Sequence, residues 1–188
     1  MKKVAIIFIL LLGFQFMSAQ DFQETKKYLV STEIKDQGQE HPEYVVNLVR
    51  SGEVSEKLSE LIIEDTELFE DIFVTTLESP GLDGISEVIK MEVEYLACCA
   101  HVEAYYFLVA DDNTVTALPQ LNNVYCENSD TDYQYIFPNQ EYGIESNILQ
   151  TQTFYTEASD IKYVNLKQSF TWNDNNYRPS KTTAITSY

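Results

Sequence analysis

The residues with the greatest potential for chemistry are three cysteines, Cys98, Cys99 and Cys126, together with His101. Alternate residues of a β-strand lie on one face, so Cys99 and His101 would share a face and Cys98 would lie on the other. Adjacent residues converge poorly on a zinc ion, and they seldom place an imidazole in line with a nucleophilic sulfur. We therefore predict a disulfide in an oxidising compartment, with Cys99 as the preferred partner of Cys126 and Cys98 as the alternative, and one remaining thiol.

A second cluster of polar side chains lies further along the chain. Asn128, Asp130 and Asp132 occupy alternate positions, as oxygen ligands do at the start of a calcium-binding EF-hand loop. The pattern is incomplete, because Tyr133 stands where that loop requires glycine and Asn139 where it requires glutamate. Calcium bound with help from another loop remains an alternative to a solvated loop. The sequence indicates no other cofactor.

Hydrolytic chemistry has little support in the sequence. There is no G-x-S-x-G motif, and the only histidines are His41 and His101. Two carboxylates can act together as the acid and the nucleophile of a glycosidase. Acidic residues are so abundant here that sequence alone selects no pair, and a hydrolase with a carboxylate pair is kept as an alternative.

The first twenty residues are typical of a secretory signal peptide. A cationic start, Met1 to Lys3, precedes an uncharged apolar run from Val4 to Phe16, and small residues follow up to Gln20. The run is shorter than the roughly 20 apolar residues of a transmembrane helix. We expect a mature chain that begins at Gln20 or Asp21, has no membrane span, and is secreted or periplasmic.

The charge of the chain is strongly negative and unevenly distributed. There are 30 acidic residues against 12 basic ones, and the formal net charge is -18. Between Leu58 and Ile161, 21 acidic residues are accompanied by a single base, Lys90. Such a field repels nucleic acids and anionic membrane surfaces, and it attracts cationic proteins and metal cations.

Residues 21–43 form a polar leader, and helical spacing follows it. The apolar residues of the next segment recur three or four positions apart with acids between them, which predicts one amphipathic helix or two in succession. They are Val54, Leu58, Leu61, Ile62, Leu68, Phe69, Ile72 and Phe73. Residues 79–84, rich in proline and glycine, predict a turn that ends this part of the chain.

The remainder of the chain has the composition of successive β-strands. Residues rich in valine, tyrosine, phenylalanine and leucine predict strands over 88–97, 102–110, 114–118, 124–126, 133–137, 144–156 and 161–172. Short turns between them indicate antiparallel pairing. We therefore predict a single α+β domain over residues 44–188, in which N-terminal helical elements pack on a mainly antiparallel β-sandwich or barrel.

Charge and composition favour binding over catalysis. We expect an exported acidic protein that binds a cationic exported protein through its acidic loops and nearby tyrosines, because oppositely charged surfaces associate faster. The predicted contact residues come from two loops and their flanks: Asp111, Asp112, Tyr125, Glu127, Asp130, Asp132 and Tyr133.

In general form, as a small, acidic, β-rich exported chain, the protein resembles periplasmic lysozyme inhibitors. The resemblance implies that binding inhibits a basic enzyme, and it transfers no individual residue. The alternative from another class is an envelope protein that binds calcium or glycans, in which Trp172 and the asparagine-rich turn after it would contact sugar.

Overall fold

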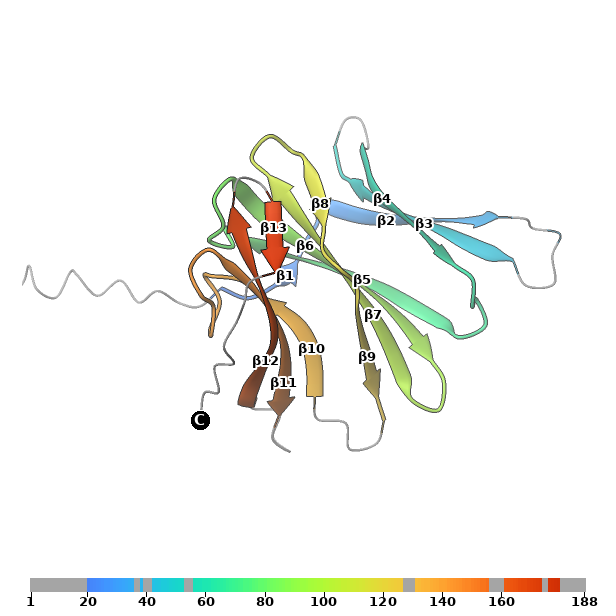
Figure 1. Cartoon of the computed structure of the whole chain (residues 1–188). Helices are drawn as coiled ribbons and strands as arrows, with labels where there is room; N and C mark the ends of the chain where they lie inside the picture. The colour runs from blue at the N-terminus through green and yellow to red at the C-terminus, as the bar shows by residue number, and fades with distance from the viewer. Residues whose placement is uncertain are drawn as a thin grey trace, which may run out of the picture.

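The computed structural model describes residues 20–35, 38, 42–52, 56–126, 131–155, 161–173 and 176–179 (Figure 1). The regular structure in these ranges consists of β-strands, and every strand pairing is antiparallel. The predicted antiparallel β-structure is thus confirmed. The prediction of an α+β domain with N-terminal helical elements is wrong. No helix in the described part of the chain is long and apolar enough to cross a membrane. Residues 1–19 of the predicted signal peptide lie outside the described ranges.

The strands form three sheets, which we call A, B and C. Sheet A contains β1 (Gln23–Glu24), β5 (Phe69–Glu78), β6 (Ile85–Leu96), β7 (Ala100–Ala110) and β8 (Val115–Ala117), and β9 (Leu121–Tyr125) also pairs with β7. Sheet B contains β2 (Tyr28–Lys35), β3 (Glu43–Arg50) and β4 (Glu56–Ile63). Sheet C contains β10 (Thr131–Ile136), β11 (Asn147–Tyr155), β12 (Ile161–Asn173) and β13 (Asn176–Pro179).

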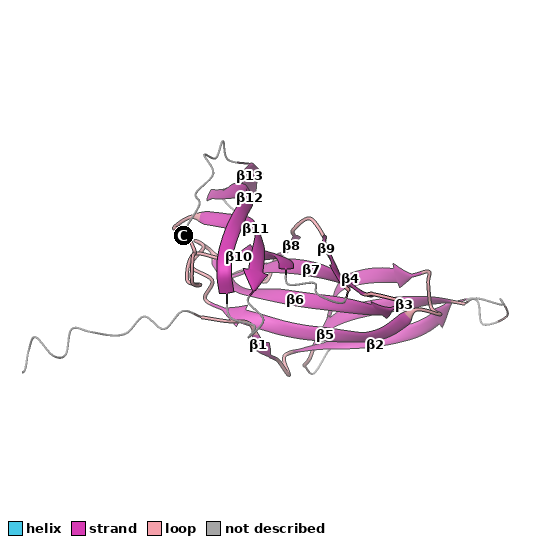
Figure 2. Ribbon diagram, turned by 90° about the horizontal axis from the view of Figure 1, so that it is seen from below, coloured by secondary structure: helices cyan, strands magenta, loops and turns pink. Residues whose placement is uncertain are grey.

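Sheet A is the middle of three layers, with sheet C on one face and sheet B on the other (Figure 2). Strand alternation explains this arrangement, because β6 and β7 carry apolar residues on both of their faces. Val88, Tyr106 and Leu108 pack towards sheet C, whereas Ile89 and Phe107 pack towards sheet B.

Two cores result from these layers. The core between sheets A and C contains a cluster of aromatic residues, Tyr106, Tyr135, Phe137, Phe170 and Trp172. The rings of Tyr106 and Tyr135 meet edge to face, with centroids 5.0 Å apart. The core between sheets A and B is largely aliphatic, with its most buried members being Tyr28, Val46, Leu48, Ile63, Ile89, Met91 and Val93.

Two β-bulges account for the incorrect helix prediction. The β3–β4 register shifts so that Leu48 faces Ser59 and Val49 faces Lys57, which leaves Leu58 as the extra residue. A bulge adds a residue and turns the spacing between inward side chains from two into three. Leu58 and Leu61 therefore both contact the same core.

The same effect occurs in β5. Its register against β6 shifts between Phe69 and Asp71, so that Phe69 and Ile72 both pack on the core between sheets A and B. Phe73 lies on the opposite face and is 49% exposed. Spacings of three and four residues, which are typical of a helix, here arise from bulged strands that lie along the core.

A buried carboxylate joins sheets A and B at the opposite end of β5 and β6 from the β5 bulge. Glu87 on β6 is 4% exposed and accepts hydrogen bonds from Lys27 Nζ and from the Tyr28 hydroxyl, each at 2.5 Å. Burial raises the pKa of Tyr28, and the hydrogen bond to Glu87 raises it further. The phenol therefore remains a donor at neutral pH, and the carboxylate is paired as a buried charge must be.

Candidate binding site

The structure separates the predicted contact residues into two groups. Asp111 and Asp112 lie in the turn after β7, and Tyr125 at the end of β9 pairs with Ala100, the first residue of β7. The eleven residues of β7 therefore separate the groups by roughly 33 Å. In Figure 1 the turn is at the top and the end of β9 is at the lower right. The two groups cannot contact one small ligand together.

Asp112 has a structural role in its turn. Its Oδ1 accepts a hydrogen bond of 2.9 Å from the backbone N–H of Thr114, and this bond lowers the pKa of Asp112. Asn113 beside it has a φ of 69°, a backbone conformation that asparagine tolerates well. Asp112 and Asn113 are thus explained by the backbone structure of the turn itself.

Tyr125 and Asp132 do lie together, at the ends of the acidic loop. Asp132 accepts hydrogen bonds from the hydroxyls of Tyr125 and Tyr155. Burial raises the pKa of both tyrosines, and the Asp132 carboxylate reinforces the shift. Tyr125 and Asp132 were predicted from sequence, and Tyr155 was not.

Tyr133 is held in place through hydrogen bonds to its backbone. Asn123 on β9 accepts a hydrogen bond from Tyr133 N at 2.7 Å and donates one to Tyr133 O at 3.1 Å. The Lys167 ammonium lies 5.9 Å from the centre of the Tyr133 ring. The remaining predicted contacts, Glu127 and Asp130, lie outside the described residues, as does Asn128 at the start of the incomplete calcium loop.

The disulfide closes the same end of sheet A. Cys99, in the turn between β6 and β7, is bonded to Cys126, the residue after β9. This confirms the preferred pairing, and Cys98 is an exposed free cysteine. The bond fixes the start of the acidic loop against the first residues of β7.

A groove of about 460 Å³ lies beside this disulfide, between β4 of sheet B and strands β6 and β7 of sheet A. Its volume is in the range of ligand-binding pockets. Apolar, aromatic and acidic side chains line it, and none is a lysine or arginine: Leu61, Ile62, Glu64, Asp65, Leu68, Tyr95, Ala97, His101, Glu103 and Tyr105.

The central polar group of the groove is Glu103 on β7. Its Oε2 accepts a hydrogen bond of 2.7 Å from the Tyr105 hydroxyl and a longer one of 3.4 Å from the Tyr95 hydroxyl. Burial raises the pKa of both phenols, and the Glu103 charge adds to the shift. Both tyrosines are therefore neutral donors that orient the carboxylate.

Flat aromatic side chains form one wall of the groove. The His101 and Tyr95 rings have centroids 5.8 Å apart and planes inclined by 32°. Asp65 lies close enough to raise the pKa of Tyr95, although burial and Glu103 contribute more. The groove thus combines planar rings, a hydrocarbon wall and negative charge.

Sequence reasoning considered His101 only as a partner of the cysteines, and it missed Glu103, Tyr95 and Tyr105. The alternation of His101, Glu103 and Tyr105 on one face of a strand was a readable signal. The facing wall comes from β4 and from the turn after it, which were predicted as helix.

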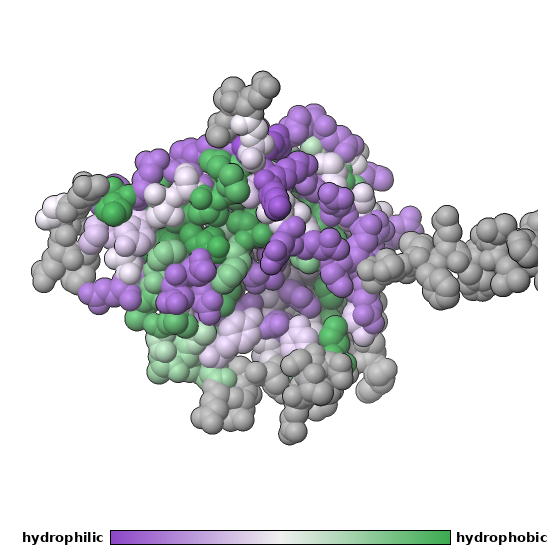
Figure 3. Space-filling view, turned by 180° about the vertical axis from the view of Figure 1, so that it is seen from behind, coloured by the Kyte–Doolittle hydropathy of each residue, from purple (hydrophilic) through white to green (hydrophobic). Residues whose placement is uncertain are grey.

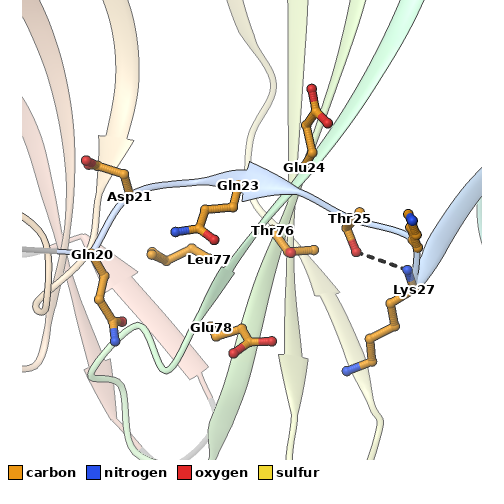
Figure 4. A pocket seen from close by; sticks show the side chains of 10 residues that line it. Gln20, Asp21, Gln23, Glu24, Thr25, Lys27, Thr76, Leu77 and Glu78 are labelled. Carbon is orange, nitrogen blue, oxygen red and sulfur yellow. Dashed lines mark hydrogen bonds between the residues drawn. The ribbon is translucent and has the colours of Figure 1, made fainter.

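A second, larger groove of about 630 Å³ runs along β1 and β5 (Figure 4). Its lining carries both signs of charge, including Asp21, Glu78 and Lys27. The charge of Lys27 is already paired within the protein, since its ammonium forms an ion pair with Glu87. Its backbone N–H donates to Thr25 Oγ1 at 3.1 Å. This mixed lining does not select a ligand by charge.

Several apolar side chains are exposed around the first groove. Ile62 is 45% exposed, Leu68 39% and Val124 56%. Val124 pairs with His101 across β9 and β7, so their side chains are on one face of sheet A. Viewed from behind, the molecule shows apolar side chains gathered left of centre and mainly hydrophilic ones on the right (Figure 3).

Trp172, the residue suggested for sugar stacking, is buried between sheets A and C. It is 5% exposed, and its indole N–H donates to the carbonyl of Asp83 at 2.8 Å. The glycan alternative therefore has no support from this ring. Among the described residues, no group of three or more His, Cys, Asp or Glu side chains could hold a metal ion.

No protein-family model, curated protein or solved structure matches this chain. Function is therefore inferred from the groove, the tyrosine cluster and the distribution of charge.

Proposed function

We propose that this protein is an exported binding protein that engages a cationic protein partner with the end of the molecule that carries the disulfide. The strongest support is the composition of the groove, whose lining includes Glu64, Asp65 and Glu103 and no lysine or arginine. The predicted signal peptide and the Cys99–Cys126 disulfide both suit an oxidising compartment outside the cytoplasm.

The ion pairs of sheets A and B also support the proposal. Basic residues of sheet B are paired with acids: Lys35 with Glu43, Arg50 with Glu56 and Lys57 with Glu60. Lys90, the base of β6, is paired with Glu92 at 2.7 Å. The acids of the groove have no such partner among its lining residues, so their charge is available to a ligand.

Two double variants test the proposal, and each removes two charges. Glu64→Gln/Asp65→Asn changes the groove, and Asp111→Asn/Asp112→Asn changes the distant turn. The two variants are well matched, because Asp65 and Asp112 each accept a hydrogen bond from a backbone N–H within a turn. The amide oxygen of asparagine can accept the same bond. The first partner to test is lysozyme, a basic exported enzyme.

We expect the mature protein to bind lysozyme, with an association rate that falls as salt rises, because screening extends over about 8 Å at physiological ionic strength. The groove variant should associate about three- to tenfold more slowly at low salt, and the turn variant much less so. Biolayer interferometry measures both rates. Equal slowing of the two variants would place the contact elsewhere, and failure to retain lysozyme or any other basic exported protein would contradict the proposed function.

A further inference from the structure

The Glu103 carboxylate in the groove is held in one orientation by hydrogen bonds to one of its two oxygens. Both phenols donate to Oε2 of Glu103, and no described residue donates a hydrogen bond to its Oε1. Glu103 also contributes to the surface of the groove. A ligand that enters there therefore meets a negatively charged acceptor whose position is set before binding, which reduces the ordering cost of binding.

The surroundings of this acceptor suit a flat cation with an apolar stem. Tyr95 and His101 line the groove with two neighbouring aromatic rings, and Leu61 and Leu68 line it with hydrocarbon. A guanidinium is planar, stacks on aromatic rings and is more weakly hydrated than an ammonium. Its five N–H donors can bind several acceptor oxygens together, which a compact ammonium does less well.

We infer that the groove binds an arginine side chain presented by the cationic partner, with its stem along Leu61 and Leu68, its plane against Tyr95 and His101, and its N–H groups on Glu103. This inference rests on the proposed function. It adds the chemical class of the group that the groove selects, and it distinguishes arginine from lysine.

The probes are three amino-acid derivatives: Nα-acetyl-arginine amide, Nα-acetyl-lysine amide and Nα-acetyl-citrulline amide. Citrulline has nearly the shape of arginine without its charge. The reporter is the imidazole of His101 in a His41→Ala background, because the chain contains only two histidines. Its carbon-bound proton resonances are followed by NMR as each probe is titrated.

We expect saturable shifts of the His101 resonances with the arginine probe, and affinities about fivefold or more weaker for lysine and citrulline. Glu103→Gln keeps an acceptor for the two tyrosine hydroxyls but removes the charge, and it should weaken arginine binding by about tenfold. Asp111→Asn/Asp112→Asn should leave arginine binding unchanged. Thermal unfolding of each variant verifies that the fold is intact.

Equal binding of lysine or citrulline would overturn the inference, as would arginine binding that survives Glu103→Gln in a folded variant. Absence of any His101 shift with arginine would also overturn it. If lysozyme or another basic protein still binds in a manner that depends on Glu64 and Asp65, the proposed function stands without this inference. If neither a basic protein nor the arginine probe binds, both the proposed function and this inference fail.

Discussion

At the residue scale, one side chain, Asn123, supplies much of the link between sheets A and C near the acidic loop. It is 5% exposed, and its amide group bonds to both backbone groups of Tyr133. Asn123 on β9 thereby holds β10 in the register that brings Asp132 to Tyr125. Asparagine suits this position because its amide offers a donor and an acceptor side by side.

Asn123→Ala should lower the free energy of unfolding by about 2–4 kcal/mol, because it leaves the N–H and C=O of Tyr133 without partners, and each such group costs about 1–3 kcal/mol when buried. Asn122→Ala is the control, since this neighbour is exposed and its side chain accepts a hydrogen bond from Gln120, another exposed residue. Its effect should be within about 0.5 kcal/mol. Urea unfolding measures both values, and similar losses for the two variants would show that the Asn123 bridge is unimportant.

At the element scale, the disulfide ties the β6–β7 turn to the end of β9 and so encloses the strand β7 that carries Glu103. Its two cysteines are 27 positions apart in sequence. Replacing both Cys99 and Cys126 by serine should lower the free energy of unfolding by about 3.5 kcal/mol, the chain-entropy value for a loop of this length. Cys98→Ser should have little effect, because Cys98 is exposed and free. Equilibrium unfolding and thiol counting test this: more than one reactive thiol in the denatured, unreduced wild-type protein would contradict it.

The strands also show how far sequence alone could predict the fold. The segments from β6 to β12 were predicted as strands because they are rich in valine, tyrosine, phenylalanine and leucine and are separated by short turns. In β4 and β5, bulges at Leu58 and after Phe69 imitate helical spacing, and a bulge is stabilised by pairing with a neighbouring strand, which a single segment does not reveal.

The candidate site was predictable only in part, for a related reason. Tyr125 and Asp132 are close in sequence and flank one loop, so their proximity followed from the chain itself. The groove combines Leu61, Tyr95 and Glu103, and its assembly depends on how sheets A and B pack. The preferred disulfide was correct because Cys99 and Cys126 lie on segments that flank a hairpin.

At the scale of the whole molecule, a large share of the tyrosines is tied to carboxylates or buried in the two cores. Six of the 13 tyrosines have a pKa raised well above the ordinary value of about 10, with burial as the largest cause in each case. They are Tyr28, Tyr95, Tyr105, Tyr106, Tyr125 and Tyr155. Acidic neighbours reinforce the shift, for example Glu103 beside Tyr105. The acidity of the protein and its tyrosine content are therefore linked.

The direction of these shifts predicts how stability depends on alkaline pH. In the unfolded chain these phenols ionise near pH 10, whereas in the folded protein they stay protonated to higher pH. Their contribution to stability is thus fully present below pH 10 and is lost as the pH rises above it, because the unfolded state then releases protons that the folded state retains. Absorbance at 295 nm, followed together with circular dichroism, should show these six tyrosines ionising only as the fold is lost. In guanidinium chloride all 13 should titrate as one group. If all of them ionise near pH 10 while the circular dichroism of the folded protein is unchanged, the buried tyrosine clusters described here do not exist in solution.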